Sequence, residues 1–487
     1  MAVETKSTPD IKIKYHHGAG LDIHKYYVTA CVAVNKEKAI EKLGVQEFKK
    51  TPDGLEQMCR FLGKYLLESI VMEATGVYTQ VVKDKLDAYA GWGAFKPDII
   101  VIHPALVKKY LGELHQDKAD ALDLARLGLV HLAKESFLPK DKIRELRGLT
   151  REIRFIDKDC TRIKNRINRI LAQWGLVLKD FDISSNWGID LCSAIISFHG
   201  SFGAVLDAIL NGQVQMCKTS KAAIQRRNTQ YKVFGAITLP ETARVSLKSY
   251  LLELSFNNAI IDLVGDEVER VIHADPKLEQ QVTRVADIPG VSEITAAAII
   301  AEIGNVFRFP SRKEFLQYVG CAPTLHQSGE KTSHGHLSKR VNPFAKTMFF
   351  IAGKSVCHVV KTESELKEYA RKQLNAHWNA KKLAWANTGI KIARIVYAIL
   401  RNDRIYEAYH DAAIQNPQLS ASKVEAGYTD LGNKGLGFST LRAKTRHYIQ
   451  FVKKFLSDDE DTWRKQLAKI FDQLLKDANL GKDPASG

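Results

Sequence analysis

Cysteine is scarce in this sequence, and the few cysteines that it has are far apart. Seven of them are scattered over 487 residues, and no two form a CxxC pair. An odd and dispersed set argues against a disulfide framework or a structural zinc site, and it favours reduced thiols in a cytosol. No apolar run approaches the ~20 residues of a membrane span, and Met1–Lys6 lacks the apolar core of a secretory signal. These absences predict a cytoplasmic protein that does not bind a membrane.

Acidic residues are outnumbered by basic ones. The chain has 71 Lys and Arg against 55 Asp and Glu, which gives a formal net charge of +16 and a pI of about 9.3. Such an excess favours a polyanionic partner, and nucleic acid is a better candidate than an anionic membrane. The length suits about two to four domains with substantial cores. We therefore expect a multidomain protein that binds nucleic acid.

The first 140 residues alternate between short apolar strands and amphipathic helices. Residues 20–23 and 28–34 are predicted strands joined by a tight polar turn, and a third strand is predicted at 39–48. Thr51 and Pro52 begin a predicted helix whose buried stripe is Leu55, Met58, Leu62 and Leu66. A mixed α/β domain is completed by strands at 69–73 and 99–102 and by helices at 78–89 and 105–132.

Four carboxylates stand on these predicted elements. Asp22 lies in the first strand and Glu73 ends a later one, while Asp117 and Asp120 are three residues apart and so project from one helix face. Each has an ordinary alternative, which is a strand position facing solvent for Asp22 and a solvated acidic helix face for the DxxD pair. Their order nevertheless suits carboxylates that converge at one end of a sheet. Such a cluster would hold Mg²⁺ for phosphoryl transfer on a nucleic-acid backbone.

These residues carry a specific resemblance to a known family. Segments 21–24, 71–76 and 117–121 resemble the three acidic motifs of the DEDD-type transposases of the insertion-sequence one-ten family. The resemblance implies a ribonuclease-H-like fold, similar to that of the RuvC-type Holliday-junction resolvases. It also implies that Asp22, Glu73, Asp117 and Asp120 hold Mg²⁺, with Mn²⁺ as a substitute. The family commonly has Lys-Thr where His115-Gln116 stand here, a departure that leaves the four carboxylates in place.

Two long helices with heptad spacing are predicted after residue 141. Apolar residues recur every three or four positions from Leu146 to Ile170, and a second seam runs from Leu247 to Ile272 with Asn258 at a core position. These seams predict a coiled coil, either within one chain or between protomers. A core Asn would disfavour other registers of the pair.

The first of these helices carries many arginines and lysines, and a basic segment follows at 218–232. Such cations are either solvated flanks or phosphate contacts. The excess of positive charge favours phosphate contacts, and the resemblance implies a coiled-coil region that helps in assembly and RNA binding. The nucleic-acid contacts expected in this region are Arg162, Arg166, Arg226 and Arg227.

Residues 286–304 have the pattern of a helix–hairpin–helix element, in which a Pro-Gly turn leads into a helix of small residues. The free backbone N–H groups and the dipole of such a helix can receive a phosphate. Gly290 is therefore a candidate for contact with a nucleic-acid backbone. An ordinary packed helix after a glycine turn has the same pattern.

Ser328 is the candidate nucleophile, and this assignment rests on the resemblance. Taken alone, Ser328-Gly329 after a polar loop is typical of a plain turn. The spacing from residue 288 to residue 340 follows the family's second transposase domain, in which a serine at this position joins covalently to a DNA 5′ phosphate. A hydroxyl is a weak nucleophile until a base, metal or cation activates it. Candidates for charge stabilisation are His326, Lys331, His334 and Lys339, and rival nucleophiles are Ser333 and Ser338.

The segment after this loop departs from the family pattern. Residues 340–344 lack a Gly and a second Arg that the family often has, and Lys346 is a candidate to replace the missing charge. The departure concerns a local turn and one phosphate contact. Lys331, Lys339 and Arg340 remain expected nucleic-acid contacts.

The expected fold class is α/β plus α, in four parts. Residues 1–140 form a RuvC-like DEDD domain, 141–280 a helical spacer with a coiled coil, 281–360 a mostly helical transposase domain and 361–487 a C-terminal helical region. Helices are predicted in the last part at 365–374, 385–400, 440–456 and 461–475. A Gly-rich loop is predicted at 431–437 and a disordered end at 481–487.

The resemblance spans roughly residues 18–410. It predicts an RNA-guided DNA recombinase of a mobile insertion element, associated with the nucleoid of a prokaryotic cell. The expected partners are target DNA, donor DNA, a non-coding bridge RNA and further copies of the chain in a dimer or tetramer. Two alternatives stay open: a metal-dependent, structure-specific nuclease without a covalent intermediate, and a catalytically silent scaffold that binds nucleic acid.

Overall fold

The structure is a computed structural model of the 487-residue chain. It describes residues 15–36, 39–93, 95–104, 107, 117–130, 135–179, 181–214, 221–328, 331–337 and 341–406. Side chains are described for these residues except 77, 117–119, 186, 221, 323–328 and 331–337. The chain divides into two compact units, residues 1–138 and 139–487. The features predicted beyond residue 411 lie outside the described residues.

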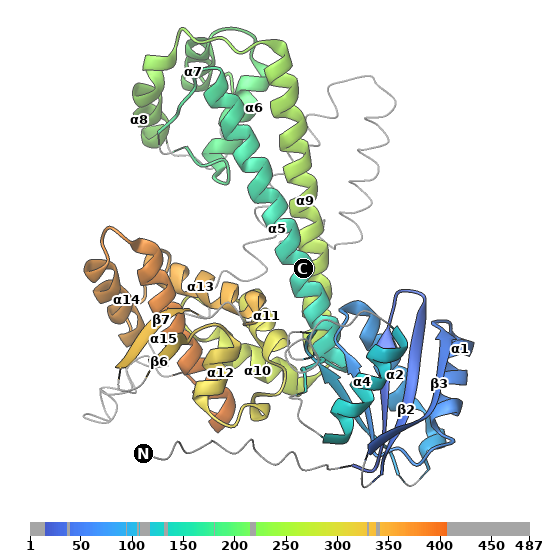
Figure 1. The fold of residues 1–487 in the computed structure, drawn as a ribbon. Helices are drawn as coiled ribbons and strands as arrows, with labels where there is room; N and C mark the ends of the chain where they lie inside the picture. Colours follow the sequence, from blue (N-terminus) through green and yellow to red (C-terminus); the bar gives the residue numbers. More distant parts are fainter. Residues whose placement is uncertain are drawn as a thin grey trace, which may run out of the picture. The chain divides into compact units, whose positions relative to one another are not determined.

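A five-stranded mixed sheet forms the centre of the first unit (Figure 1). Its strands are β1 (His17–Ile23), β2 (Tyr27–Lys36), β3 (Ala39–Lys49), β4 (Ser69–Glu73) and β5 (Asp98–Ile102), in the order β3-β2-β1-β4-β5. The pairs β1–β2 and β2–β3 are antiparallel, whereas β1–β4 and β4–β5 are parallel. The predicted strands are confirmed, and the mixed sheet is consistent with a ribonuclease-H-like domain.

Helices cover both faces of this sheet. α1 (Pro52–Leu62) and α2 (Val77–Ala88) share one apolar cluster with Leu21 and Met72. α4 (Asp117–Val130) packs on the opposite face, where Leu124 clusters with Val71. Because side chains alternate along a strand, the even-numbered positions of β1 face α4. The predicted helix at 105–132 is confirmed over the extent of α4, and most of its earlier part lies outside the described residues.

α1 begins as predicted but ends earlier. The hydroxyl of Thr51 accepts a hydrogen bond of 3.2 Å from the N–H of Gly54, and a proline occupies the first turn. The helix then ends at Leu62, and Leu66 is 81% exposed. The prediction that Leu66 belongs to the buried stripe is wrong, because Gly63 ends the helix before the stripe repeats again.

The second unit begins with two 33-residue helices, α5 (Asp141–Gln173) and α9 (Glu241–His273). They pack along each other within one chain (Figure 1). They run antiparallel, because Cys160 interacts electrostatically with Glu253 and Lys142 with Glu267. The end of the pair where α5 finishes carries α6 (Asn186–Ser197), α7 (Phe202–Leu210) and α8 (Lys221–Tyr231).

The two predicted heptad seams are buried along most of their length. Leu149 and Asn258 are only half-buried, whereas the other seam residues lie in the core. The Nδ2 of Asn258 donates a hydrogen bond of 2.8 Å to the carbonyl of Leu254 in its own helix. Asn258 therefore does not fix the register by pairing across the two helices. The regular interlocking of a coiled coil stays a prediction.

The remainder of the second unit is a helical body with one hairpin. Its helices are α10 (Pro276–Ala286), α11 (Glu293–Ile303), α12 (Arg312–Tyr318), α13 (Pro343–His358), α14 (Glu365–Ala376) and α15 (Lys381–Asn402). The hairpin consists of β6 (Pro323–Ser328) and β7 (Lys331–Leu337), where the sequence indicates only a polar loop. The helices predicted at 365–374 and 385–400 are confirmed, and the second begins one turn earlier than predicted.

α15 is the one described helix that is long and apolar enough to cross a membrane. It packs closely against α13 in the helical body. A Cβ on Gly353 would lie 2.2 Å from the carbonyl oxygen of Trp385, and one on Gly389 would lie 2.5 Å from that of Phe349. The two glycines let the helix backbones touch, which is the packing of a core helix.

The cysteines are expected to resist alkylation in the folded protein. The six cysteines among the described residues are buried and free. Burial raises the pKa of Cys160 to about 11 and that of Cys192 to about 12. The thiolate is the reactive form, so iodoacetamide at pH 8 should label them slowly in native buffer and rapidly in urea. Peptide mass spectrometry measures the labelling, and rapid native labelling of Cys192 would contradict its burial.

Candidate functional site

Asp22 and Glu73 lie side by side at one edge of the first unit's sheet. β1 and β4 are parallel neighbours, and Leu21 pairs with Met72. The next position along each strand is therefore Asp22 on β1 and Glu73 on β4. Leu21 and Met72 are fully buried under α1 and α2, so alternation directs the two carboxylates toward the face that α4 covers.

A close approach of helix and strand brings the start of α4 to the same edge. A Cβ on Gly20 would lie 2.0 Å from the carbonyl oxygen of Ala121 and 2.3 Å from the backbone nitrogen of Ala125. Gly18 instead faces Leu129, farther along α4. The helix therefore runs antiparallel to β1, and its first turns lie toward the end of the strand that carries Asp22.

The DxxD pair occupies those first turns of α4. Asp117 is the first residue of the helix, and Asp120 immediately precedes the residue that contacts Gly20. Asp120 is half-buried, whereas the side chain of Asp117 lies outside what the structure describes. The backbone thus brings the four predicted carboxylate positions to one end of one domain, on three elements.

Asp22 has a histidine partner that the sequence analysis missed. The Nε2 of His24 lies 2.9 Å from the Oδ2 of Asp22, and the Asp22 side chain is 16% exposed. The ring of His24 stacks on Tyr27 at a centroid distance of 4.5 Å, which fixes its orientation. The signal was present as the close spacing of Asp22 and His24 in the motif itself.

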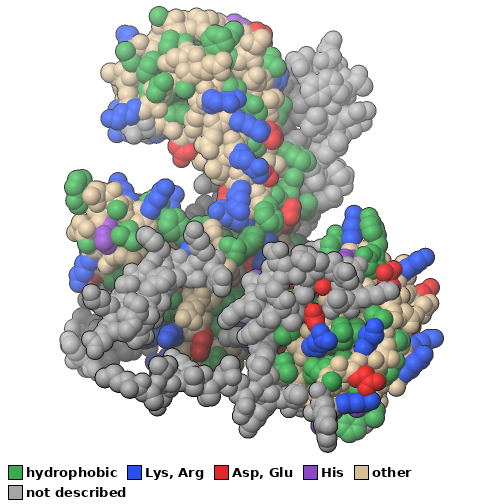
Figure 2. Space-filling model, viewed as in Figure 1, with side chains coloured by type: hydrophobic (Ala, Val, Ile, Leu, Met, Phe, Trp, Pro, Cys, Tyr) green, Lys and Arg blue, Asp and Glu red, His purple; other side chains and the backbone are tan. Residues whose placement is uncertain are grey.

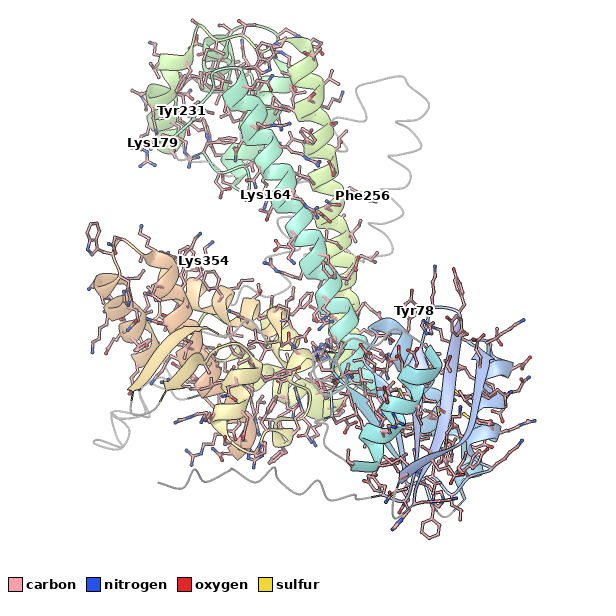
Figure 3. All side chains as sticks on the ribbon, in the orientation of Figure 1. Tyr78, Lys164, Lys179, Tyr231, Phe256 and Lys354 are labelled. Atoms are coloured by element: carbon pink, nitrogen blue, oxygen red, sulfur yellow. The ribbon has the colours of Figure 1, made fainter. Side chains whose placement is uncertain are left out.

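Lys50 contacts the backbone of His24. The Nζ of Lys50 donates a hydrogen bond of 2.9 Å to the carbonyl of His24 and lies 4.0 Å from the ring centroid of Tyr78, on α2 (Figure 3). Burial lowers the pKa of Lys50 from its ordinary value. The turn after β1 is therefore held by a cation that also contacts the helix following Glu73.

The donor set suits a hard divalent cation, because carboxylate oxygens are the ligands that Mg²⁺ and Mn²⁺ take in proteins. Within the part of the chain that the structure describes, no three His, Cys, Asp or Glu side chains form a metal-binding group. That search does not include the Asp117 side chain. The assignment of the four carboxylates as ligands stays a prediction.

The predicted nucleophile lies at the tip of the β6–β7 hairpin. Ser328 is the last residue of β6 and pairs with Lys331, the first residue of β7. His326 pairs with Ser333, two positions farther from the tip. Only the backbone of these strands is described, and Ser338, Lys339 and Arg340 lie outside the described residues. The backbone places Ser328 and Lys331 opposite each other on either side of a two-residue loop.

Asn342 marks the point where the chain re-enters the helical body after this hairpin. Its Oδ1 accepts hydrogen bonds of 3.1 Å from the N–H groups of Phe344 and Ala345 and thereby caps α13. Its Nδ2 donates to the Oε2 of Glu302 at 2.7 Å and to the Oη of Tyr318 at 3.1 Å. One amide therefore joins the start of α13 to α11 and α12.

Glu302 is the centre of this network and was not predicted from the sequence. The Nε of Arg151 donates to its Oε1 at 2.6 Å, and the Nη2 of Arg147 lies 2.7 Å from its Oε2. Burial by itself raises the pKa of Glu302, but the hydrogen bonds from Arg151 and Asn342 and the charge of Arg147 prevail and hold it below its ordinary value. The signal was a single Glu inside the apolar run of α11.

Gly290 lies in the turn between α10 and α11 with a φ of +84°. A Cβ there would lie 2.6 Å from the side chain of Val356 on α13, so packing already requires a glycine. The Oγ of Ser292 accepts a hydrogen bond of 3.3 Å from the N–H of Thr295 and caps α11 itself. The role of Gly290 as a phosphate contact stays a prediction.

The four predicted arginines of the helical spacer have different surroundings. Arg162 is exposed and paired with Asp159, and Arg226 is exposed on α8. Arg166 lies 5.8 Å from the ring of Tyr250, and Arg227 lies 5.0 Å from that of buried Trp187. Figure 2 shows Lys and Arg side chains spread along the long helices, and Lys164 on α5 is labelled in Figure 3. Arg227 thus has a packing role whether or not it contacts nucleic acid.

A mixed sheet with carboxylates near the ends of two parallel strands, followed by long helices and a helical body, is the architecture expected of a DEDD transposase. Two family models match it in that order. One, described as "Transposase" of the DEDD type, matches residues 19–175. The other, "Transposase IS116/IS110/IS902 family", matches residues 282–371. The chain belongs to the insertion-sequence one-ten (IS110) family of transposases.

Several curated proteins are similar to this chain. It is 29% identical over 147 residues to "Transposase for insertion sequence element IS1111A" of Coxiella burnetii, covering 30% of this chain and 39% of that protein. It is 28% identical over 107 residues to the "Pilin gene-inverting protein" of Moraxella bovis, covering 22% and 33%. It is 23% identical over 319 residues to "Insertion element IS110 uncharacterized 43.6 kDa protein" of Streptomyces coelicolor, covering 63% and 75%. The chain thus spans about two fifths of the length of the first of these relatives.

Proposed function

We propose that this protein is a DNA recombinase that moves an insertion element by cutting and rejoining DNA. The observation that carries the proposal is the convergence of three elements in the first unit. Asp22 is the next-to-last residue of β1 and Glu73 is the last residue of β4, its parallel neighbour, and the antiparallel approach of α4 brings the positions of Asp117 and Asp120 to that edge. Family membership supports the proposal, as do the names of the relatives, a transposase and a pilin gene-inverting protein.

The carboxylates and the serine have separate tasks in this proposal. Asp22, Glu73, Asp117 and Asp120 hold a divalent cation, Mg²⁺ or Mn²⁺, which neutralises the charge of the scissile phosphate when it is bound. His24 orients Asp22 through its hydrogen bond of 2.9 Å. Lys331, whose backbone pairs with that of Ser328 in the hairpin, stabilises charge near the reacting hydroxyl.

The covalent step conserves the number of phosphodiester bonds. The Oγ of Ser328 attacks the phosphorus, the Oγ–P bond forms and the bond from phosphorus to the 3′ oxygen breaks. The serine proton leaves to a nearby base or water, and the departing 3′ oxygen gains a proton. In the joining step another 3′ hydroxyl attacks the phosphoserine and releases the serine. No nucleotide cofactor is required, because the bond energy is kept in the serine ester.

The partners in this proposal follow from the family resemblance and from the charge of the chain. A non-coding bridge RNA pairs with target and donor DNA, so that base pairing selects the sequence and the protein contacts backbone and shape. Exposed cations such as Arg162 and Arg226 suit backbone contact. The active assembly that the resemblance implies is a homodimer or tetramer.

Trapping the covalent intermediate tests the proposal. The substrate is a plasmid that carries the element with its flanking DNA, incubated with Mg²⁺ and RNA transcribed from the element's non-coding ends. We expect a DNA adduct that survives denaturation and maps to Ser328 by mass spectrometry. Ser328→Ala should abolish the adduct and lower strand exchange at least ~10³-fold, whereas the matched variant Ser333→Ala should retain both.

The rival functions give different results in the same assay. A metal-dependent nuclease would cut DNA without an adduct, and Ser328→Ala would leave its cutting undiminished. A silent scaffold would bind DNA in a salt-sensitive manner and would be unaffected by Asp22→Ala or Glu73→Ala. Either pattern would overturn the proposed recombinase.

A further inference from the structure

The helical body carries a cluster of cations and aromatic rings on α13, α14 and α15, and none of these residues belongs to the serine hairpin. Residues 350–391 contain eight Lys and Arg against three Asp and Glu. Several of these cations stand beside exposed apolar side chains, and Figure 2 shows both kinds on this part of the surface. The residues of interest, called the tryptophan–lysine surface from here on, are Lys354, His358, Trp378, Lys381, Lys382 and Trp385.

Trp385 is the fixed centre of the tryptophan–lysine surface. Its Nε1–H donates a hydrogen bond of 2.8 Å to the Nε2 of His358, and its ring stands nearly perpendicular to the His358 ring at a centroid distance of 5.4 Å. Phe350 meets the same indole at 5.7 Å, and the Nζ of Lys354 lies 5.3 Å from its centroid. Lys354 is labelled on α13 in Figure 3. The indole is therefore held in one orientation with a cation over it.

Trp378 provides an exposed ring close by. It lies in the turn between α14 and α15 and is 76% exposed. Lys381 follows three residues later at the start of α15, and three residues of chain span at most about 11 Å. A tryptophan this exposed gains little from the fold, because an indole stabilises a protein mainly through burial. Its large flat face is available to a partner.

The surroundings of His358 report a positive potential at this surface. Burial lowers the pKa of His358, and the charges of Lys381, Lys354 and Lys367 lower it further. These lysines come from α15, α13 and α14, so cations from three helices act on the imidazole. Lys367 is already engaged with the carbonyl of Val356 at 2.9 Å. Among the described residues, Lys354, Lys381 and Lys382 make no ion pair that would neutralise them.

We propose that the tryptophan–lysine surface binds a single-stranded segment of nucleic acid, with a base stacked on Trp378 and phosphates against Lys354, Lys381 and Lys382. Unpaired cations match a polyanion, and an exposed indole matches an unpaired base. A duplex hides the faces of its bases, so it cannot use Trp378 in this way. The proposal deepens the proposed function, since it gives the recombinase a contact for the strands that pairing and cutting leave unpaired.

Fluorescence anisotropy of 12-nucleotide oligonucleotides tests this proposal without requiring catalysis. The protein is the full chain with Ser328→Ala, and the probes are poly-dT, poly-U and a mixed-sequence duplex. We expect both single strands to bind, and Trp378→Ala to weaken them about tenfold, within the range for loss of one stacked base. Lys381→Glu with Lys382→Glu should reduce the slope of log Kd against log salt by about 1.4, because each lost phosphate contact contributes about 0.7 for single strands.

Matched variants separate this surface from general charge and from misfolding. Trp174→Ala removes another exposed indole, and Lys277→Glu with Lys313→Glu makes the same change of charge elsewhere in the unit. These controls should keep single-strand affinity within about twofold of the parent. Lys381→Gln with Lys382→Gln, which reverses no charge, should reduce the salt slope by the same amount as the Glu pair.

Three results would overturn the tryptophan–lysine surface as a single-strand site. One is unchanged single-strand binding in both Trp378→Ala and the lysine variants. A second is an equal loss for the duplex and the single strands, which indicates unspecific charge. A third is a loss of self-association without loss of oligonucleotide binding, which indicates a contact between copies. Preference for poly-U or poly-dT identifies RNA or DNA as the strand. The adduct at Ser328 is measured separately, so failure here leaves the proposed function standing.

Discussion

Glu302→Ala is expected to lower the free energy of unfolding of the second unit by about 3–5 kcal/mol, which is the range for removing one partner of a buried ion pair. Glu302 is 1% exposed and receives Arg147, Arg151 and Asn342. The substitution would leave two guanidinium groups without their shared carboxylate in a poorly solvated place. Urea denaturation followed by circular dichroism measures the loss, read from the transition of this unit.

Two comparisons separate the charge of Glu302 from its size and from surface effects. Glu302→Gln keeps the shape and several hydrogen bonds but removes the charge. Its free energy of unfolding should therefore lie between those of the parent and Glu302→Ala. Glu267→Ala breaks an exposed pair with Arg270 on α9 and should change stability by no more than about 0.5 kcal/mol. Equal stability of Glu302→Ala and the parent would mean that the pair contributes nothing to folding.

The stability that Glu302 contributes should depend on pH. The pKa of Glu302 is lower in the folded protein than its ordinary value, which is about 4.3 in an unfolded chain. Its contribution to stability is therefore complete above that ordinary value and is lost as the pH falls through the folded pKa. Stability of the parent should fall more steeply below pH ~4.3 than that of Glu302→Gln. If the stabilities of the two proteins decreased in parallel below pH ~4.3, the lowered pKa of Glu302 would be contradicted.

Gly20→Ala is expected to destabilise the first unit by about 3 kcal/mol or more, at the upper end for overpacking a core. The added Cβ would lie 2.0 Å from the carbonyl oxygen of Ala121 and 2.3 Å from the nitrogen of Ala125. Both atoms belong to the backbone of α4, so no side-chain rotation relieves the clash. The helix must move away from β1, and the positions of Asp117 and Asp120 move with it.

A second glycine serves as the matched control for this prediction. Gly148 lies within α5, and a Cβ there meets no atom within 4 Å. Gly148→Ala should stabilise its unit by about 0.5–1 kcal/mol, because alanine favours a helix. Chemical denaturation of both variants measures the contrast, and Mn²⁺ titration of Gly20→Ala should show weaker binding than the parent. A Gly20→Ala protein as stable as the parent would mean that α4 does not touch β1.

Local patterns assigned the strands that carry Asp22 and Glu73 and their order along the chain. The pairing of β1 with β4 and its register, which set the two carboxylates side by side, come from the structure. The approach of α4 was not predictable, because nothing local indicates that Gly20 is a contact point. The pairing of Glu302 with Arg151 was also not predictable from the sequence, because 151 residues separate them and only the folded unit brings them together.

The predictions that were wrong or absent also have local causes. Leu66 continues the apolar spacing of α1, but Gly63 ends the helix first, and periodicity alone does not reveal a helix end. The β6–β7 hairpin has few of the alternating apolar residues that mark a strand, and Pro323, His326 and Gly335 weaken any strand signal in its sequence. The role of Ser328 came from the family resemblance alone, because the chemistry of a serine is not visible in its spacing.

The anchoring of α5 on Glu302 has a mechanical consequence. α5 has 33 residues, which makes it about 50 Å long at 1.5 Å per residue, and it is fixed near its first turns by Arg147 and Arg151. The part of α5 before this anchor is short, and the part beyond it is long and ends among α6, α7 and α8. A tilt of about 5° at the anchor displaces the far end by about 3 Å, because Gln173 lies about 33 Å along the helix from Arg151. A displacement of α6, α7 and α8 therefore also shifts Arg147 and Arg151. These arginines share Glu302 with the amide of Asn342, which lies where the serine hairpin rejoins the body.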